Sequence, residues 1–239
     1  MSTARIIEIF SSIQGEGIYV GLPHLFVRFW DCNLSCHYCD TDYRGPYREQ
    51  TVEELLSEVK KRIEKEGPHH AVSLTGGEPL LWWKFLKELL PRLKGMGQTT
   101  YLETNGALPA ALSEVLPWTD IIAMDLKPPS ATADRPVWKE HEAFLRIAYA
   151  GGNGSGHRPQ IFVKIVVTRE TLKEELQRAW ELVAKVDRSI PVVLQPVTPF
   201  REVTESPGPE QLDFWQHEAR LLLSDVRVIP QVHRILGVP

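Results

Sequence analysis

The stretch Cys32-Asn33-Leu34-Ser35-Cys36-His37-Tyr38-Cys39 contains all three cysteines of a chain of 239 residues. Cysteines that only fill a core would be spread along the sequence, so this grouping needs a chemical reason. Thiolates gathered in one loop usually hold a metal ion or an iron–sulfur cluster. The spacing C-x3-C-x2-C therefore predicts a metal-binding loop.

The kind of metal site follows from the number of thiolates. Three cysteines leave a four-iron cluster one protein ligand short, because closed clusters are normally held by four, so one iron would be open. Structural zinc is the alternative, with His37 as a nitrogen donor. Such sites usually bring their ligands in two separated pairs, and this sequence has no second pair. We favour the open cluster over zinc.

A disulfide fits the sequence poorly. The number of cysteines is odd, and no apolar signal segment precedes the strand-like run that follows Met1–Arg5. No apolar stretch approaches the roughly 18 residues needed to span a bilayer. We therefore expect a protein of the reducing cytoplasm that has no membrane partner.

The composition limits the classes of protein without choosing a function. With 43% hydrophobic residues the chain can build one well-buried core, so we expect a single domain over residues 1–239. The net charge of -4 and the pI of about 6.1 argue against a broad basic surface. Nucleic acid is therefore not an expected direct partner.

Strand-like and helix-like segments alternate along the chain. The strand-like runs, rich in Val, Ile and aromatic residues, are His24–Trp30, Ala71–Leu74, Thr99–Glu103, Ile121–Leu126, Ile161–Val167 and Val192–Gln195. The clearest helix begins after Thr51, which can cap it while Glu54 completes a capping box. Similar amphipathic segments cover Lys84–Leu93, Leu172–Val186 and Glu210–Leu223.

This alternation predicts an α/β fold, an incomplete (βα)6 TIM-like barrel of parallel strands joined by right-handed crossovers. An open doubly wound sheet has the same alternation and is the alternative. Gly151–Gly156 is rich in glycine, but it precedes a strand, whereas a dinucleotide-binding loop follows one. We interpret this segment as a connection, and the sequence favours the partial barrel.

Polar or glycine-rich segments follow five of the predicted strands. They are the cysteine loop, Thr75–Pro79, Glu103–Gly106, Asp125–Pro128 and Gln195–Pro196. In a parallel barrel the carboxyl ends of the strands meet at one mouth, where barrel enzymes carry out their chemistry. Taken singly, a Gly-Gly or Asn-Gly pair is more often a turn. In Gly76-Gly77-Glu78, however, the glycines permit close approach of a ligand and Glu78 offers an acceptor for an ammonium group, which suits an amino acid moiety.

The same residues resemble the radical S-adenosylmethionine enzymes. Cys32, Cys36 and Cys39 match the cysteine signature of that superfamily, with Tyr38 as the aromatic residue before the last cysteine, and Thr75–Pro79 matches its GGEP loop. The resemblance implies that the thiolates hold a 4Fe-4S cluster and that S-adenosylmethionine binds the open iron through its amino and carboxylate groups. It also implies radical chemistry, because an electron from the cluster then cleaves the sulfonium to give a 5'-deoxyadenosyl radical.

A narrower resemblance covers essentially the whole chain. The sequence is similar to the 7-carboxy-7-deazaguanine synthases at Ser12–Gly17, Arg28, Cys39–Thr41, Glu103–Gly106, Lys127 and Gln231–His233. That family converts 6-carboxy-5,6,7,8-tetrahydropterin into 7-carboxy-7-deazaguanine with loss of ammonia, on the route to queuosine in tRNA and to other deazapurines. The resemblance implies a carbon–nitrogen lyase that regenerates S-adenosylmethionine each turnover and depends on Mg²⁺.

The resemblance also assigns residues to ligands, with Thr41 supplying an oxygen ligand to Mg²⁺. The residues expected to face S-adenosylmethionine are Tyr38, Asp40, Gly77, Glu78, Glu103, Asn105, Lys127 and Gln195. Those expected to bind the pterin are Ile13, Gln14, Gly15, Glu16, Arg28, Thr75, His233 and Pro239. We assign no catalytic side chain beyond the cluster and the radical.

Two of these assignments have support in the residues themselves. Arg28 lies in the apolar run Leu25–Trp30, where an unpaired charge would be costly to bury, and its guanidinium can bind a carboxylate through two hydrogen bonds. The tail, about residues 225–239, is apolar enough to pack over the barrel mouth and bring His233 to the pterin. A frayed terminus is the ordinary alternative.

Two other functions stay open on the sequence. A glycyl-radical-enzyme activating enzyme shares the cysteine signature but gives no reason for Arg28 or for Gln14–Glu16. A zinc-stapled binding module without enzymatic activity is the second alternative, and metal content separates it. For the enzyme we expect an electron donor such as flavodoxin or ferredoxin. We also expect a homodimer, because an incomplete barrel leaves an exposed strand edge.

Overall fold

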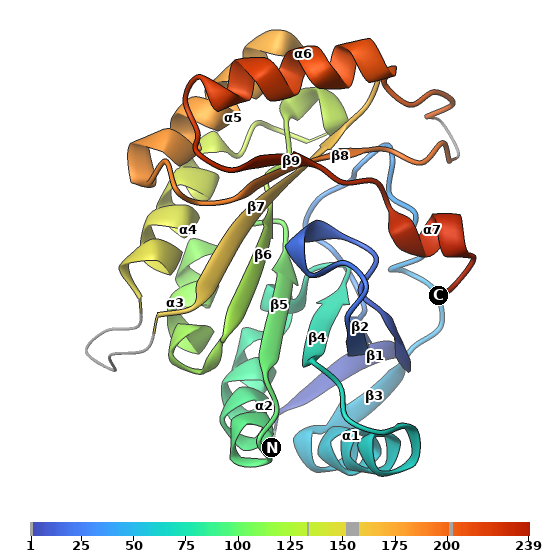
Figure 1. The fold of residues 1–239 in the computed structure, drawn as a ribbon. Coiled ribbons are helices and arrows are strands. Elements are labelled where there is room, and N and C mark those ends of the chain that lie inside the picture. Colours follow the sequence, from blue (N-terminus) through green and yellow to red (C-terminus); the bar gives the residue numbers. More distant parts are fainter. Residues whose placement is uncertain (1, 133, 152–157, 201–202) are drawn as a thin grey trace.

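The computed structural model describes residues 2–132, 134–151, 158–200 and 203–239, so that 152–156 of the glycine-rich segment lie outside it. Within these ranges one nine-stranded sheet has the order β3-β1-β2-β4-β5-β6-β7-β8-β9 (Figure 1). The strands are β1 (Thr3–Ile13), β2 (Pro23–Phe29), β3 (Arg48–Thr51), β4 (Ala71–Gly76), β5 (Thr100–Thr104), β6 (Ile121–Asp125), β7 (Gln160–Val167), β8 (Val192–Pro196) and β9 (Val226–Val228). The helices are α1 (Val52–Glu66), α2 (Trp83–Gly95), α3 (Pro109–Val115), α4 (Trp138–Ala150), α5 (Lys173–Val186), α6 (Pro209–Arg220) and α7 (Val232–Leu236).

The sheet is parallel from β2 to β9. Each neighbouring pair in the series β2, β4, β5, β6, β7, β8 and β9 is parallel, whereas β1 pairs antiparallel with both β2 and β3. The six predicted strands correspond to β2 and β4–β8, and a helix follows each of them before the next parallel strand. The predicted (βα)6 arrangement is therefore confirmed, with a short β9 and an antiparallel β1–β3 pair added at its two sides.

The two faces of the sheet have different coverings. Alternate strand residues such as Leu74, Leu102 and Ile165 share one continuous core with buried residues of α1–α6. These helices lie on the outer face of the sheet, while the connection after β1 and the C-terminal segment lie on its inner face (Figure 1). A doubly wound sheet would carry helices on both faces. The doubly wound alternative is therefore wrong, and the sheet is an open barrel.

The capping box predicted for the first helix is present. Thr51 Oγ1 accepts a hydrogen bond from the Glu54 backbone N–H at 3.3 Å, and Glu54 Oε2 accepts one from the Thr51 N–H at 2.8 Å. Reciprocal caps of this kind satisfy N–H groups that the first helical turn leaves without partners. This fixes the start of α1 directly after the edge strand β3.

The connection between β1 and β2 crosses the inner face of the barrel. Ile18 and Tyr19, in the short 3-10 helix η1 (Gly17–Tyr19), pack on Tyr101 and Phe162. Gly17 has φ +69, and a Cβ there would lie 2.5 Å from the Phe162 ring. Glycine is thus required for this close approach. The packing brings the preceding residues 14–16 to the mouth of the barrel.

The strands at the two edges of the open barrel, β3 and β9, are both short. β3 forms one edge with four residues, of which Arg48 and Glu49 are exposed. β9 forms the other with three residues, with Arg227 exposed at its centre. Among the described residues, no helix has the length and apolar character needed to cross a membrane.

Candidate functional site

A cavity of about 480 Å³ lies at the carboxyl ends of the strands. Of the residues assigned to ligands from the sequence, it is lined by Ile13, Gln14, Gly15, Glu16, Arg28, Cys32, Cys36, Tyr38, Cys39, Asp40, Thr41, Thr75, Gly77, Glu103, Asn105, Lys127, Gln195, His233 and Pro239. Segments from β1 to the C-terminus therefore meet at one place, as expected for the mouth of a parallel barrel. Glu78 is the assigned residue that does not line this cavity.

The cysteine loop begins at Asp31, which has a left-handed backbone with φ 71. The Asp31 side chain accepts a 2.8 Å hydrogen bond from the Cys32 N–H, and this bond tightens the turn out of β2. Asp tolerates this conformation because its short side chain can bond to the local backbone. Burial raises the pKa of the Cys32 thiol to about 12 and also raises that of Cys36. Bound metal would reverse this tendency, because it stabilises the thiolate.

The donor set fits an iron–sulfur cluster better than zinc. In the described part of the chain, no three His, Cys, Asp or Glu side chains are close enough to hold one metal ion together. The three thiols instead line a shared cavity, and Asn105 Nδ2 donates a 3.8 Å hydrogen bond to Cys32 Sγ. Three thiolates can each bind one iron of a four-iron cluster, whereas structural zinc almost always takes four protein ligands. The number of thiols therefore does not favour the zinc-stapled module.

The two glycines after β4 allow the loop to pass against the cysteine loop. Gly76 has φ +125, and a Cβ on Gly77 would lie 1.8 Å from the carbonyl oxygen of Asp31. The Gly77 N–H donates to the Phe29 carbonyl at 3.1 Å, and the Glu78 N–H donates to the Asp31 carbonyl at 2.8 Å. The close approach is thus between two backbones, whereas the sequence reasoning had foreseen an approach by a ligand.

The Glu78 carboxylate is fully buried beneath the cavity. It accepts hydrogen bonds from the backbone N–H of Leu80 at 3.0 Å, from Thr104 Oγ1 at 2.8 Å and from the backbone N–H of Asn105 at 2.8 Å. These bonds join the loop after β4 to the end of β5. The sequence had assigned Glu78 to the ammonium group of S-adenosylmethionine, and that assignment stays a prediction. In this structure the carboxylate serves to hold two loops together.

Glu103 lies among residues that the sequence assigned to the pterin. Its two carboxylate oxygens accept hydrogen bonds from Gln14 Nε2 at 2.9 Å and from Thr75 Oγ1 at 3.0 Å. Burial raises the pKa of Glu103, and the nearby ammonium of Lys164 opposes that effect. The assignment of Glu103 to S-adenosylmethionine stays a prediction, and its contacts in the structure are with Gln14 and Thr75.

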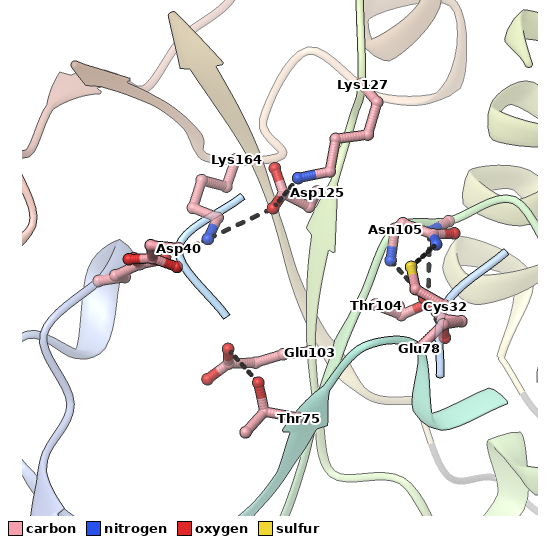
Figure 2. A network of polar contacts seen from close by, with 12 residues as sticks. Cys32, Asp40, Thr75, Glu78, Glu103, Thr104, Asn105, Asp125, Lys127 and Lys164 are labelled. Carbon is pink, nitrogen blue, oxygen red and sulfur yellow. Dashed lines mark hydrogen bonds and ion pairs between the residues drawn. The ribbon is translucent and has the colours of Figure 1, made fainter. Parts of the chain in front are cut away.

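A line of four alternating charges crosses the cavity wall, made by Glu16, Lys164, Asp125 and Lys127. Lys164 forms an ion pair with Glu16 and lies 3.4 Å from Asp125 Oδ2, which is 2.6 Å from Lys127 Nζ. Figure 2 shows the two lysines meeting at Asp125, above the Thr75–Glu103 pair. Burial alone would raise the pKa of Glu16, but Lys164 lowers it to about 2. Glu16 is therefore a carboxylate at neutral pH.

Sequence reasoning missed Lys164 and gave Asp125 no role. The available signal was the same one that identified Arg28, because Lys164 is a charged residue within the apolar run Ile161–Val167. Two buried acceptors in the cavity wall, Asp125 Oδ1 and Gln195 Oε1, have no hydrogen-bond partner among the described residues. A buried acceptor without a partner is costly, so a ligand that donates to these atoms would be stabilised.

Arg28 connects β1, β2 and the cysteine loop. Its Nε donates to Glu8 Oε1 at 2.6 Å, and its Nη1 donates to Thr41 Oγ1 at 3.2 Å. The side chain is 22% exposed, while Glu8 is 50% exposed. The Glu8 contact is an ion pair at the surface. The guanidinium nevertheless lines the cavity beside Thr41, which was assigned to Mg²⁺.

The C-terminal segment lies against the cavity. Gln231 Nε2 donates to Glu16 Oε1 at 2.8 Å, and Arg234 forms a 2.7 Å ion pair with Asp40. A main-chain oxygen of Pro239 accepts a 2.8 Å hydrogen bond from Ser12 Oγ. His233 packs on Gly15, where a Cβ would come within 2.2 Å of the imidazole Nδ1. Asp40 is thus paired with the tail, and residues 226–228 of the tail are the edge strand β9.

The sequence was compared with protein-family models and with known proteins. Residues 31–146 match the family model described as the radical SAM superfamily. A 7-carboxy-7-deazaguanine synthase of Geobacter sulfurreducens is 38% identical over 253 residues, covering 98% of this chain and 97% of that protein. A 7-carboxy-7-deazaguanine synthase of Methanothermobacter thermautotrophicus is 34% identical over 250 residues, covering 98% of each.

Among solved structures, QueE from Escherichia coli is similar in fold, with a TM-score of 0.64, 20% identity, and coverage of 97% of this chain and 95% of that one. A radical SAM methyltransferase from Sphaerobacter thermophilus has a TM-score of 0.65 and 16% identity, covering 87% of this chain and 66% of that one. Both relatives are 7-carboxy-7-deazaguanine synthases and match nearly the entire sequence. They therefore favour neither the glycyl-radical-enzyme activating enzyme nor the zinc-stapled binding module. The chain therefore belongs to the 7-carboxy-7-deazaguanine synthase family, within the radical SAM superfamily.

Proposed function

We propose that this protein converts 6-carboxy-5,6,7,8-tetrahydropterin into 7-carboxy-7-deazaguanine with loss of ammonia. The observation that carries the proposal is that one cavity is lined by three thiols and by the polar side chains of Gln14, Arg28 and Glu103. Its cofactors are a 4Fe-4S cluster held by the three cysteines, and S-adenosylmethionine. When bound, the cluster supplies the electron that cleaves S-adenosylmethionine.

The side chains on the Glu103 side of the cavity suit the pterin ring. The aminopyrimidinone edge of a pterin presents N–H donors, and Glu16 and Glu103 are carboxylates that line the same cavity. Their oxygens can accept from such donors, and Thr75 and Gln14 hold Glu103 in place. This pairing of charged acceptors with N–H groups orients the ring relative to the cysteine loop.

Arg28 and Thr41 suit the carboxylate of the substrate. Arg28 Nη1 and Thr41 Oγ1 lie 3.2 Å apart in the cavity wall, so a carboxylate bound there meets a guanidinium and a hydroxyl together. Mg²⁺ prefers oxygen ligands and keeps several waters, so one hydroxyl together with the substrate carboxylate can hold it. We propose that Thr41 is the protein ligand of this Mg²⁺.

The part of the cavity wall around Lys127 suits S-adenosylmethionine. Lys127 lies 5.1 Å from the Tyr38 ring centroid, and both line the cavity near Cys36. Asp125 Oδ1 and Gln195 Oε1 are the buried acceptors without partners, so they are suited to hydroxyl or amino donors of the nucleoside. We propose that this wall, together with Gly77 and Asn105, holds S-adenosylmethionine.

The test uses protein reconstituted with iron and sulfide in the absence of oxygen. With dithionite, S-adenosylmethionine, Mg²⁺ and the carboxytetrahydropterin, the expected product is 7-carboxy-7-deazaguanine, identified by mass and ultraviolet spectrum. The Cys36→Ala variant is the control and should form none. The function is contradicted when the wild-type cluster is intact and cleaves S-adenosylmethionine, yet the pterin is recovered unchanged.

Further parts of the proposal concern the surroundings of the enzyme. We propose a small flavodoxin or ferredoxin as the electron donor, a cytoplasmic location and a homodimer. We also propose that residues 1–239 act as one domain whose tail, after the edge strand β9, closes the cavity. Sedimentation of the reconstituted protein tests the dimer, and replacement of dithionite by reduced flavodoxin or ferredoxin tests the donor.

A further inference from the structure

Lys164 lies in the middle of β7, and its side chain lines the cavity. Its neighbours Val163 and Ile165 belong to the helix-facing core, so the alternation of the strand puts Lys164 on the inner face. The side chain is only 12% exposed. Burying an ammonium group is costly unless it is paired. The ammonium group of Lys164 must therefore be stabilised by neighbouring groups of opposite charge.

Two carboxylates contact the ammonium group of Lys164. Glu16 forms the ion pair, and Asp125 Oδ2 lies further away, at 3.4 Å. Asp125 has a second and closer cation, because Lys127 Nζ is 2.6 Å from the same oxygen. Within the described ranges, Lys164 is the ion-pair partner of Glu16. Loss of Lys164 would leave Asp125 paired but would leave Glu16 without its counter-ion.

The Glu16 carboxylate is held at both oxygens. Lys164 contacts Oε2, and Gln231 Nε2 donates to Oε1 at 2.8 Å. The backbone N–H of Glu16 donates to Gln14 Oε1 at 3.0 Å, which fixes the segment that carries the carboxylate. A carboxylate oxygen can accept more than one hydrogen bond, so both oxygens retain capacity for a ligand. The Glu16 carboxylate is thus fixed in the cavity wall and can accept further hydrogen bonds from a ligand.

We propose that Lys164 is a positioning residue that holds the Glu16 carboxylate in the orientation that accepts hydrogen bonds from the N–H groups of the pterin. This inference rests on the proposed function, because it takes a pterin to be the ligand. Holding an acceptor in its binding orientation before the ligand arrives reduces the cost of binding. Without Lys164, the neutral amide of Gln231 would hold only one of the two oxygens.

The test measures binding of 6-carboxypterin, a fluorescent oxidised analogue of the substrate, together with steady-state kinetics. The Lys164→Met variant should weaken binding by about 10- to 100-fold, as expected for loss of a hydrogen-bonded charged group. KM for the carboxytetrahydropterin should rise by a similar factor, with a smaller change in kcat. Lys164→Arg keeps the charge and should restore most of the affinity.

A double-mutant cycle separates action through Glu16 from a general effect of charge. Glu16→Gln should weaken binding, and the double variant Glu16→Gln, Lys164→Met should weaken it no further. A second ligand sharpens the test, because 6-carboxylumazine carries an oxo group in place of the 2-amino group. The wild type should prefer the pterin to the lumazine, and Lys164→Met should lose most of that preference.

The matched control is Lys87→Met, which removes an exposed lysine paired with Glu114 on the helical side and should leave binding unchanged. The melting temperature and the iron content of each variant show whether it is folded.

The double variant Glu16→Gln, Lys164→Met buries no unpaired charge, so its binding can still be measured when Lys164→Met alone unfolds. The inference is overturned by additive losses in the cycle, or by unchanged binding in Lys164→Met. When wild-type protein binds no 6-carboxypterin and forms no product, the proposed function itself is wrong.

Discussion

The Glu78 carboxylate accepts a 2.8 Å hydrogen bond from the backbone N–H of Asn105, whose side-chain amide in turn donates to the Cys32 sulfur at 3.8 Å. A fully buried carboxyl group therefore fixes the residue that touches the cysteine loop (Figure 2). Removing the carboxylate leaves three buried donors, on Leu80, Thr104 and Asn105, without their acceptor.

We therefore expect Glu78→Ala to lower the free energy of unfolding by about 3 kcal/mol or more, because unsatisfied buried donors keep their full desolvation cost. Urea denaturation of the reconstituted protein measures this loss, and iron content should fall with it. Glu88→Ala, on the exposed side of α2, is the matched control and should change stability little. Equal losses in the two variants would argue against the role of Glu78.

Gly77 should not tolerate alanine. A Cβ there would lie 1.8 Å from the Asp31 carbonyl oxygen, so the loop would have to move away from the cysteines. We expect Gly77→Ala to lose most of its cluster and its affinity for S-adenosylmethionine, measured by iron content and by the change in the electron paramagnetic resonance spectrum on adding that ligand.

Gly95→Ala is the control for that substitution. A Cβ at Gly95, the last residue of α2, meets nothing within 4 Å. Alanine there should leave the cluster intact and raise stability by about 0.5 kcal/mol, because it restricts the unfolded chain. Retention of a normal cluster in Gly77→Ala would show that the loop adapts and would contradict the prediction.

Arg28 should recognise the carboxylate of the substrate. In Arg28→Lys a single ammonium replaces the guanidinium fork between Glu8 and Thr41. We expect the affinity for 6-carboxypterin to fall about 10-fold or more, because the fork cannot be reproduced by lysine. The affinity for unsubstituted pterin, which lacks the carboxylate, should change much less.

Fluorescence titration measures the affinities for 6-carboxypterin and for unsubstituted pterin. The ratio of the two affinities reports how well the protein recognises the carboxylate. Glu8→Gln serves as the companion variant, since it removes the ion-pair partner of Arg28 without touching the guanidinium. A loss in Arg28→Lys that is the same for both ligands would point to a structural effect and not to recognition of the carboxylate.

His24 should make stability depend on pH. Its imidazole is fully buried, with Nδ1 2.8 Å from Ser73 Oγ and Nε2 3.1 Å from His70 Nδ1. Burial, followed by the neighbouring His70 and His69, lowers the pKa of His24 from 6.5 to about 3. The unfolded state therefore binds more protons between these values. This contribution to stability is complete above about pH 6.5 and is lost as the pH falls toward 3.

For this one group the loss between pH 7 and pH 5 is about 2 kcal/mol. Urea denaturation at the two pH values measures it, and in His24→Gln the difference should shrink by that amount. His217→Gln, at an exposed position of α6, should keep the wild-type difference. An unchanged pH dependence in His24→Gln would show that other groups, such as the buried His141, account for the effect.

The parallel part of the fold could be predicted because buried strands leave a strong local pattern. Apart from Arg28 and Lys164, the runs Leu25–Trp30 and Ile161–Val167 are apolar on both faces, as is typical of strands covered on both sides. The short edges left no such pattern, since β3 and β9 owe their pairing to β1 and β8 and not to their own sequences. The helix α3 was not predicted, because its seven residues make only about two turns and so show no clear repeat of apolar positions.

In the candidate site, too, some residues could be predicted from the sequence and others could not. Residues next to glycine, proline or cysteine could be found from the sequence because those residues mark the loops after the strands. Lys164 could not be assigned in the same way, because its partner Glu16 is 148 residues away and only the closed fold brings them together. Glu78 and Glu103 looked alike in the sequence. Their different surroundings, below the cavity and in its wall, follow from tertiary packing.

The short, charged edges of the sheet bear on how the protein behaves at high concentration. An exposed strand edge is a template on which a foreign strand can add and initiate fibril growth. Here one edge offers four residues with Arg48 and Glu49 exposed, and the other offers three with Arg227 at its centre. Such edges give an incoming strand few backbone partners and unfavourable neighbours. We therefore expect strand addition at β3 and at β9 to be disfavoured in the concentrated samples that spectroscopy requires.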